Sequence, residues 1–128
     1  MLRETKYNTT LKIFETVFYG DVGMNELIEM MKTLARLSQT YACYKSLVDF
    51  SNSKLMLCTK EVDSLPMLIN EICLPIKTNM DKIKRALIVN KIVENSTDVF
   101  YRMVKLKDGS LFKVFYDRPA AIRWLMME

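Results

Sequence analysis

The feature that most constrains the fold is an alternation of short apolar segments with amphipathic ones along the chain. Strand-like segments cover residues 9–19, 44–50, 86–89 and 111–116, and each is followed by residues with helical periodicity. The order βαβαβαβα favours a mostly parallel sheet joined by right-handed crossovers. A chain of 128 residues can bury one substantial core. We therefore expect a single α/β domain over residues 1–128, with a four- to five-stranded sheet and four helices.

The apolar pattern of the strands predicts that both faces of the sheet are covered. Residues 9–19 are rich in β-branched and aromatic side chains, with apolar residues on both faces of the alternation. Residues 3–7 are expected to pair with this strand as a hairpin arm, and Gly20-Asp21-Val22-Gly23 to end it. Ala86-Leu87-Ile88-Val89 is a continuous apolar run, which is typical of a strand buried on both faces.

Three of the expected helices have clear sequence signals. The first covers residues 24–37, where apolar side chains recur at helical spacing. The third is expected to be capped by Asn95 or Ser96. The fourth is expected to follow Asp117 as its cap, with Pro119 in its first turn.

The middle helix, over about residues 60–78, has an ambiguous start. Thr59 is placed as its cap, but Pro66 conflicts with a continuous helix because proline lacks the backbone N–H and clashes with the preceding turn. Either the helix kinks at Pro66, or it begins at Ser64 with Pro66 in its first turn. Pro75 ends or kinks the helix again.

The composition excludes several classes of catalytic and metal site. Histidine is absent, which removes Ser-His-Asp and Cys-His schemes and His-ligated zinc. Cys43, Cys58 and Cys73 are far apart in sequence, so zinc-ribbon and thioredoxin-type motifs do not fit. No glycine-rich phosphate loop or paired-carboxylate motif is present. We therefore expect a chain that is not an enzyme and that uses no metal and no cofactor.

The charge and hydropathy of the chain indicate which kinds of partner it binds and in which cellular compartment it is expected. The net charge of +4 is spread along the chain, so we expect no nucleic-acid binding. The basic run of Lys82, Lys84 and Arg85 is interpreted as a solvated edge. No segment reaches the roughly eighteen apolar residues of a membrane span. The amino terminus shows no secretory pattern, so we expect a cytoplasmic protein with reduced cysteines.

Polar residues follow the strand at residues 44–50, where open α/β sheets bind ligands and partners. Asp49 is interpreted first as the acceptor of an Asx-turn and alternatively as a functional carboxylate. Ser51, Asn52 and Ser53 are expected to form a polar turn and, second, to bind a partner.

Motifs in both halves of the chain suggest a family. The amino half contains Tyr19-Gly20-Asp21-Val22 before the first helix, and the strand end Leu47-Val48-Asp49-Phe50-Ser51. The carboxyl half contains Val99-Phe100-Tyr101-Arg102-Met103, then Phe112-Lys113-Val114-Phe115-Tyr116-Asp117 leading into Ala120-Ala121-Ile122-Arg123-Trp124-Leu125. Together with the order of elements, these motifs resemble the SpoIIAA-like STAS superfamily of anti-sigma-factor-antagonist and transporter-tail domains. The resemblance covers nearly the whole chain from residue 11, and the final motif is similar to that of small stand-alone bacterial members.

The resemblance implies a non-enzymatic module that docks on a protein partner. In the signalling branch of the family, a Ser or Thr after the second main strand is phosphorylated, and the added charge switches docking off. The signalling motif Asp-Ser-Ser-Gly is absent from this chain, whose corresponding region reads Ser53-Lys54-Leu55-Met56-Leu57-Cys58-Thr59-Lys60. Thr59 is the nearest hydroxyl at a helix start, and it is the candidate phosphoacceptor.

These observations predict a working surface at the exit of the second main strand and the amino end of the third helix. Its partner-binding residues are Asp49, Ser51, Asn52, Ser53, Thr59, Asn95 and Ser96. An apolar patch is expected from Leu55, Met56, Leu57 and Met67, and would imply a protein partner, a dimer or an apolar ligand. The alternative function is a carrier of a small apolar or lipid-like ligand between the sheet and the methionine-rich middle helix, while core packing is the default reading of these side chains.

Overall fold

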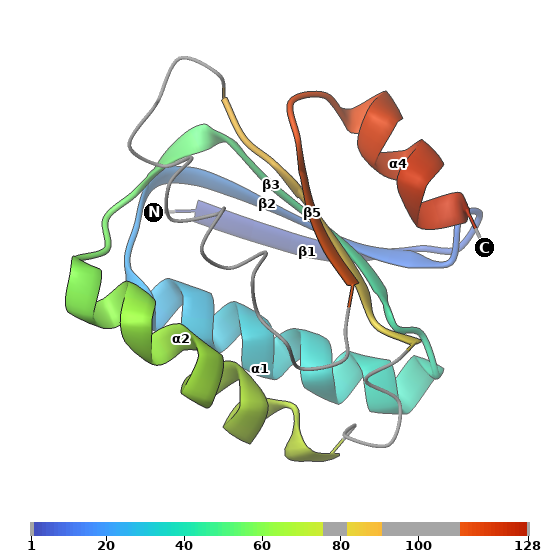
Figure 1. Cartoon of the computed structure of the whole chain (residues 1–128). Helices are drawn as coiled ribbons and strands as arrows, with labels where there is room; N and C mark the ends of the chain where they lie inside the picture. Colours follow the sequence, from blue (N-terminus) through green and yellow to red (C-terminus); the bar gives the residue numbers. More distant parts are fainter. Residues whose placement is uncertain (1, 76–81, 91–110, 128) are drawn as a thin grey trace.

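The computed structural model describes residues 2–75, 82–90 and 111–127 (Figure 1). Their elements are β1 Leu2–Asn8, β2 Ile13–Val22, α1 Met24–Tyr41, β3 Lys45–Leu55, α2 Thr59–Ile72, β4 Lys84–Ile88, β5 Leu111–Phe115 and α4 Arg118–Met126. The strands form one sheet in the order β1-β2-β3-β4-β5, antiparallel between β1 and β2 and parallel elsewhere. The predicted α/β class with a mostly parallel sheet is confirmed. Three of the four predicted helices lie in the described residues, and the one expected after Asn95 or Ser96 lies outside them.

Helices cover both faces of the sheet: α1 and α2 lie on one side and α4 on the other (Figure 1). β4 shows why both layers are needed. Leu87 and Val89 belong to the core under α1 and α2, whereas Ala86 and Ile88 belong to the core under α4. Successive side chains of a strand point to opposite faces, so a continuous apolar run needs cover on both. The prediction of a strand buried on both faces is confirmed.

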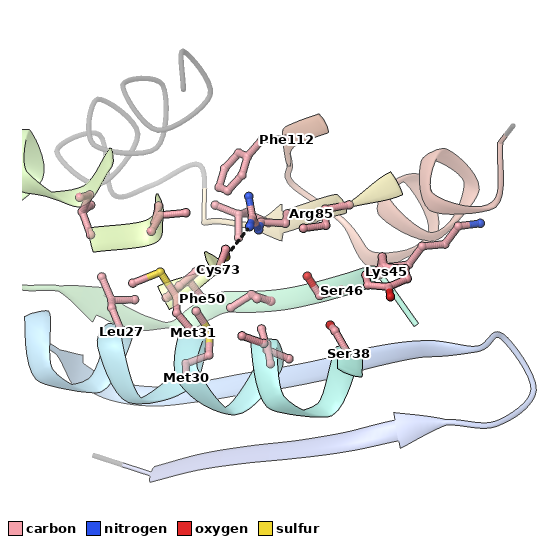
Figure 2. Close-up of a pocket in the computed structure, with 18 residues that line it drawn as sticks. Leu27, Met30, Met31, Ser38, Lys45, Ser46, Phe50, Cys73, Arg85 and Phe112 are labelled. Carbon is pink, nitrogen blue, oxygen red and sulfur yellow. Dashed lines mark hydrogen bonds between the residues drawn. The ribbon is translucent and has the colours of Figure 1, made fainter. Parts of the chain in front are cut away.

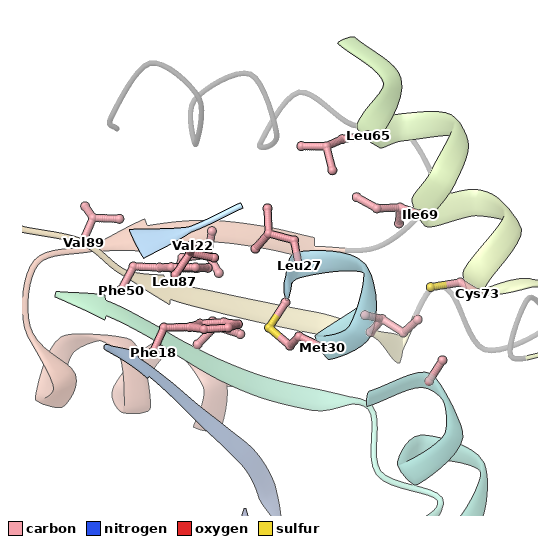
Figure 3. Close-up of a cluster of buried hydrophobic side chains, with 13 residues drawn as sticks. Phe18, Val22, Leu27, Met30, Phe50, Leu65, Ile69, Cys73, Leu87 and Val89 are labelled. Carbon is pink, nitrogen blue, oxygen red and sulfur yellow. The ribbon is translucent and has the colours of Figure 1, made fainter. Parts of the chain in front are cut away.

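The larger core lies between the sheet and the pair α1 and α2 (Figure 3). Phe18 of β2 stacks on Phe50 of β3, with ring centroids 5.2 Å apart and an interplanar angle of 10°. Leu27 of α1 and Leu65 and Ile69 of α2 close over these strands. Since each buried apolar side chain of this size contributes roughly 1.5–3 kcal/mol, packing rather than local propensity fixes both helices.

The hairpin of β1 and β2 confirms that residues 3–7 pair with the following strand, but β2 begins at Ile13 rather than at residue 9. The intervening residues form the turn. The side-chain Oδ1 of Asn8 accepts the backbone N–H groups of Thr10 and Leu11 at 3.1 and 3.0 Å, which competes with strand pairing.

β2 and β3 are both longer than predicted at their carboxyl ends. β2 runs past Gly20, which has a φ of 81°, as far as Val22, and β3 pairs with it up to Leu55. The prediction that Gly20-Asp21-Val22-Gly23 ends the strand is therefore wrong. Parallel pairing between the two strands overrides the turn preference of the local sequence.

α2 resolves the ambiguity at Pro66 in favour of a continuous helix. It begins at Thr59 with Cys58 as its N-cap, so Thr59 is the first helical residue and not the cap, and the alternative start at Ser64 is wrong. A proline inside a helix costs about 3 kcal/mol. Leu65 and Ile69, on either side of Pro66, are buried against the sheet, and this burial offsets a cost of that size. α2 ends at Ile72, ahead of Pro75, and the predicted extension over residues 76–78 lies outside the described residues.

The boundaries of the other two helices have simple causes. In α1, Gly23 donates its N–H to Glu26 Oε2 at 3.0 Å, and the helix runs four residues further than the predicted 24–37. In α4, Asp117 is the predicted cap, because its Oδ1 accepts the N–H of Ala120 at 2.8 Å. Lys84 of β4 donates from Nζ to the carbonyl oxygens of Trp124 at 3.1 Å and Met127 at 2.6 Å, which satisfies the carboxyl end of this helix.

Glu15 is a buried carboxylate that joins the hairpin to the start of α4. Its Oε1 accepts from Arg118 Nη2 at 2.6 Å and Nε at 3.1 Å, and its Oε2 accepts from Asn8 Nδ2 at 3.1 Å. Burial by itself raises the pKa of Glu15, but the hydrogen bonds from Arg118 and Asn8 and the positive charges of Arg118 and Lys6 outweigh it and hold the pKa below its ordinary 4.5.

Replacing Leu125 with Ala tests the packing of α4 on the sheet. Leu125 is fully buried, so Leu125→Ala is expected to lower the free energy of unfolding by about 2–5 kcal/mol. Met126→Ala on the same helix, at a 37% exposed side chain, is the matched control and is expected to cost about 0.5 kcal/mol or less. Urea unfolding followed by circular dichroism measures both, and equal losses would contradict the packing described.

Glu15→Gln tests the buried carboxylate through the pH dependence of stability. Because the pKa of Glu15 is lowered in the folded state, its contribution is fully present above pH 4.5 and is lost as the pH falls through the lower folded-state value. The Arg118 side chain is 52% exposed and partly screened, so we expect a loss of only about 1 kcal/mol at pH 7. The gap between the urea midpoints of wild type and variant should close on acidification. A gap that stays constant down to pH 2 would refute this role.

Candidate functional site

The residues that follow the strand predicted at 44–50 continue that strand and belong to β3. Ser51, Asn52 and Ser53 were expected in a turn, but they continue the strand, with Asn52 opposite Tyr19 and Ser53 opposite Gly20 of β2. The expectation of a polar turn at residues 51–53 is therefore wrong. Of the three side chains, that of Asn52 is exposed, whereas those of Ser51 and Ser53 are half-buried.

Asp49 stabilises an irregularity inside β3. The register advances from Val17 opposite Asp49 to Tyr19 opposite Asn52, so β3 has one extra residue at this point. Asp49 Oδ1 accepts the N–H of Ser51 at 2.8 Å and its hydroxyl at 2.6 Å. This is the Asx pattern preferred in the first interpretation of Asp49, although it supports a bulge in the strand and not a turn after it.

The exposed surface lies beyond this bulge, at the carboxyl edge of the sheet. We define the carboxyl-edge surface as residues 52–60. Met56 donates its N–H to the carbonyl of Val22 at 2.7 Å, which fixes the chain across the ends of β2 and β3. The exposed side chains of this surface are Asn52, Lys54, Met56, Cys58, Thr59 and Lys60.

The start of α2 closes the carboxyl-edge surface. Cys58 donates its N–H to Glu61 Oε1 at 3.1 Å, and its thiol is exposed. Thr59 is exposed in the first turn of the helix, where the backbone N–H groups favour negative charge, although the carboxylate of Glu61 also occupies this turn. Asn95 and Ser96, predicted to lie beside this edge, are outside the described residues.

The four residues of the predicted apolar patch divide into two kinds. Met56 and Met67 are 50% and 67% exposed. Leu55 and Leu57 are half-buried and pack against the larger core. Of these four residues only the two methionines are exposed, Met56 on the carboxyl-edge surface before α2 and Met67 on α2 itself.

A cavity lies on the same side of the sheet, between α1 and α2 and strands β3, β4 and β5 (Figure 2). Its volume is about 70 Å³, and it is lined mainly by apolar side chains. Its methionines are Met30 and Met31 of α1, and not the exposed Met56 and Met67. An engineered cavity of about 150 Å³ holds one benzene, so this space is too small for a lipid chain.

Several residues of this cavity were missed or misread from the sequence. Arg85 was interpreted as part of a solvated edge, but it lines the cavity, and its Nη2 donates to Cys73 Sγ at 3.4 Å. Ser38 and Ser46 line the cavity and were not singled out. The interpretation as a solvated edge is also wrong for Lys84, because this side chain binds the carboxyl end of α4. Lys82 is exposed, as this interpretation expects. The alternation of β4 between its two faces is the signal that separates Lys84 from Arg85.

The cysteines and acidic residues offer little further chemistry. Burial raises the pKa of the Cys43 thiol, whose Sγ donates to the carbonyl of Lys12 at 3.0 Å, and both effects favour the protonated thiol over the thiolate. Among the described residues, no group of three or more His, Cys, Asp or Glu side chains could hold a metal ion. No helix in the described ranges has the length and apolar character needed to cross a membrane.

Comparison of the sequence with protein families and curated proteins finds no relative. No protein-family model matches the chain, and no curated protein matches it. Comparison with solved structures does find matches over nearly the whole chain.

Three of these structures share the fold. The structure of the anti-sigma factor antagonist SpoIIAA in its unphosphorylated form is 9% identical, with a TM-score of 0.57 over 97% of both chains. The phosphorylated form of the Bacillus cell fate determinant SpoIIAA is 11% identical, with a TM-score of 0.52 over 96% of this chain and 99% of that one. An uncharacterised protein of Shewanella loihica PV-4 with a SpoIIAA-like fold is 16% identical, with a TM-score of 0.52 over 97% of this chain and 92% of that one. The chain therefore has the SpoIIAA-like, or STAS-like, fold that its motifs suggested.

Proposed function

We propose that this chain is a non-enzymatic regulatory module that docks on a protein partner in the cytoplasm through its carboxyl-edge surface, residues 52–60. The observation that carries the proposal is Met56, a half-exposed apolar side chain among exposed polar and charged ones. Protein interfaces combine apolar anchors of this kind with a polar rim.

The fold and the position of the surface support docking. One structure with the same fold is described as an anti-sigma factor antagonist, which is a regulatory protein. The carboxyl edge of parallel strands is also where open α/β sheets bind ligands. Lys54 and Lys60 flank Met56 on the carboxyl-edge surface, so the preferred partner presents an apolar side chain beside acidic ones.

We further propose Thr59 as a phosphoacceptor that switches this docking off. Its side chain is exposed in the first turn of α2. One of the similar structures is described as phosphorylated. A phosphate here would gain from the helix amino terminus but would meet the carboxylate of Glu61 in the same turn, and it would add about two negative charges to the docking surface.

Met56→Asp tests docking directly. A charged side chain in place of the apolar Met56 is expected to weaken partner capture by a factor of about ten or more. Met126→Asp, on α4 at the other face of the sheet, is the matched control and should leave capture unchanged. Affinity capture from native cells with quantitative mass spectrometry compares the two variants. Light scattering of the purified protein identifies the case in which the captured partner is a second copy of the chain. Equal capture by wild type and Met56→Asp would contradict docking at this surface.

Thr59→Ala tests the phosphoacceptor. Phosphate-affinity electrophoresis of the protein from its native cells is expected to show a slower species that disappears in Thr59→Ala. Thr40→Ala is the control, since Thr40 is exposed on α1 away from the carboxyl-edge surface. If wild type shows no slower species, or if that species persists in Thr59→Ala, the switch is not at Thr59.

A further inference from the structure

β1 lies at one end of the sheet and has an unpaired edge. Among residues 2–75, 82–90 and 111–127, β2 is the only strand that pairs with it. The N–H and C=O groups of alternate residues in a strand point to opposite edges, so about half of those in β1 point away from β2. Apart from the Asn8 carbonyl, which accepts the N–H of Lys12 in the hairpin turn, no backbone group of β1 bonds to a described residue outside the sheet. This edge can therefore pair with an added strand.

Two exposed side chains of opposite charge lie on one face of this edge strand. Glu4 and Lys6 are two residues apart in β1, so both point to the same face of the sheet. α4 packs mainly on β4 and β5, so it leaves this face open at β1. Lys6 is opposite Glu15, whose carboxylate already binds Arg118. Neither Glu4 nor Lys6 forms an ion pair with another described residue, so both charges are available to a partner.

The order of these charges makes β1 complementary to a second copy of itself. When two β1 strands pair antiparallel around Thr5, the whole of Leu2–Asn8 overlaps, and each Glu4 lies opposite Lys6 of the other copy. The Cβ atoms of directly opposite residues are about 4.5–5.5 Å apart, so both pairs are within reach of a salt bridge. A centre shifted by one residue places Glu4 opposite Glu4, or Lys6 opposite Lys6. Like charges in such positions destabilise the pairing, so the charges select the register centred on Thr5.

The other face of β1 favours the same register. Arg3 and Tyr7 are half-buried on the side of α1, where the ring of Tyr7 stacks on Tyr41 with centroids 4.9 Å apart. Pairing centred on Thr5 places Arg3 of one copy opposite Tyr7 of the other, and a guanidinium over a tyrosine ring is a favourable contact. Tyr41 is 52% exposed beside this edge, so its ring has further apolar surface to bury.

β5, at the other end of the sheet, lacks this self-complementarity. Antiparallel self-pairing over the full length of Leu111–Phe115 places Lys113 opposite Lys113. Charged side chains of this kind protect an edge strand from pairing with another chain. The charges of β1 have opposite signs and lie at equal distances from Thr5, so they favour self-pairing in place of preventing it.

We propose that this chain forms a two-fold symmetric homodimer by antiparallel pairing of β1 with β1 of a second copy, centred on Thr5. Such a self-complementary surface is what an isologous interface requires. Each copy contributes one strand of seven residues, which is less than the interface of a permanent dimer, so we expect a dissociation constant in the micromolar range. β2 separates β1 from β3, so the dimer interface does not include the carboxyl-edge surface. The dimer and the proposed docking can therefore fail independently.

Sedimentation equilibrium of the unaltered chain tests self-association without any variant. The average mass is expected to rise from that of one chain to that of two as the concentration increases through the micromolar range. The pairs of Glu4 and Lys6 are exposed, so added salt screens them and is expected to weaken the dimer severalfold. Met56→Asp, which removes the proposed docking anchor, is expected to sediment as wild type does, and this result separates the dimer from docking.

Charge reversal tests the register. Glu4→Lys and Lys6→Glu each place like charges opposite one another at both pairs, so each is expected to weaken the dimer by about tenfold or more. An equimolar mixture of the two variants restores opposite charges at both pairs and is expected to form mixed dimers with about the wild-type affinity. Glu71→Lys, at an exposed position of α2, is the matched control and should dimerise as wild type does.

Circular dichroism first establishes that each variant is folded, because Lys6→Glu also brings a negative charge opposite Glu15. If Lys6→Glu does not fold, the comparison of Glu4→Lys with Glu71→Lys decides in its place.

Three results would overturn the proposal. The first is the mass of a single chain at every concentration of wild type, which would mean that β1 does not self-pair. The second is an equal loss of association in Glu4→Lys and Glu71→Lys, which would show an effect of net charge and not of β1. The third is a mixture of Glu4→Lys and Lys6→Glu that associates no better than either variant alone, which would exclude pairing centred on Thr5.

Discussion

The structure depends on burying the central strands β3 and β4 on both faces. The side chains of β4 and of Val89 after it alternate: Lys84, Ala86 and Ile88 face α4, whereas Arg85, Leu87 and Val89 face α1 and α2. A strand of this kind is stable only between two helical layers, because either uncovered face would expose several apolar side chains to water. Because of the same alternation, two neighbouring cations lie on opposite faces of the sheet. Lys84 binds the end of α4, and Arg85 lines the cavity.

This arrangement separates the cavity from the carboxyl-edge surface along β3. The cavity is lined by the first half of β3, from Lys45 to Phe50, and the carboxyl-edge surface includes the other end of this strand. The ten residues from Ser46 to Leu55 are separated by nine steps, which span about 30 Å at a rise of roughly 3.3 Å per residue. The bulge at Asp49 lies between them, where its carboxylate holds the extra residue of β3.

The fold could be predicted well because its signals are local and repeated. Continuous apolar runs marked β4, helical periodicity marked α1, and Asp117 marked the start of α4, since capping chemistry acts over only a few residues. The ends of β2 and β3 could not be predicted in the same way. Gly20 and the residues Ser51, Asn52 and Ser53 have the composition of turns, and pairing between strands distant in sequence makes them part of the sheet. Pro66 was ambiguous for the same reason, because burial of its neighbours outweighs its local cost.

For the candidate sites, as for the fold, some features could be predicted from the sequence and others depend on the tertiary structure. The sequence by itself determined the class of the fold, the burial of both faces of β4 and the absence of histidine. Only the tertiary structure decided that Leu55 and Leu57 turn inward while Met56 and Met67 remain exposed. Only the structure could unite Ser38, Ser46 and Arg85, since they come from a helix and two strands spread over 48 residues (38 to 85). Periodicity shows which face of an element is buried, but the groups that meet across that face depend on the register and packing of the whole domain.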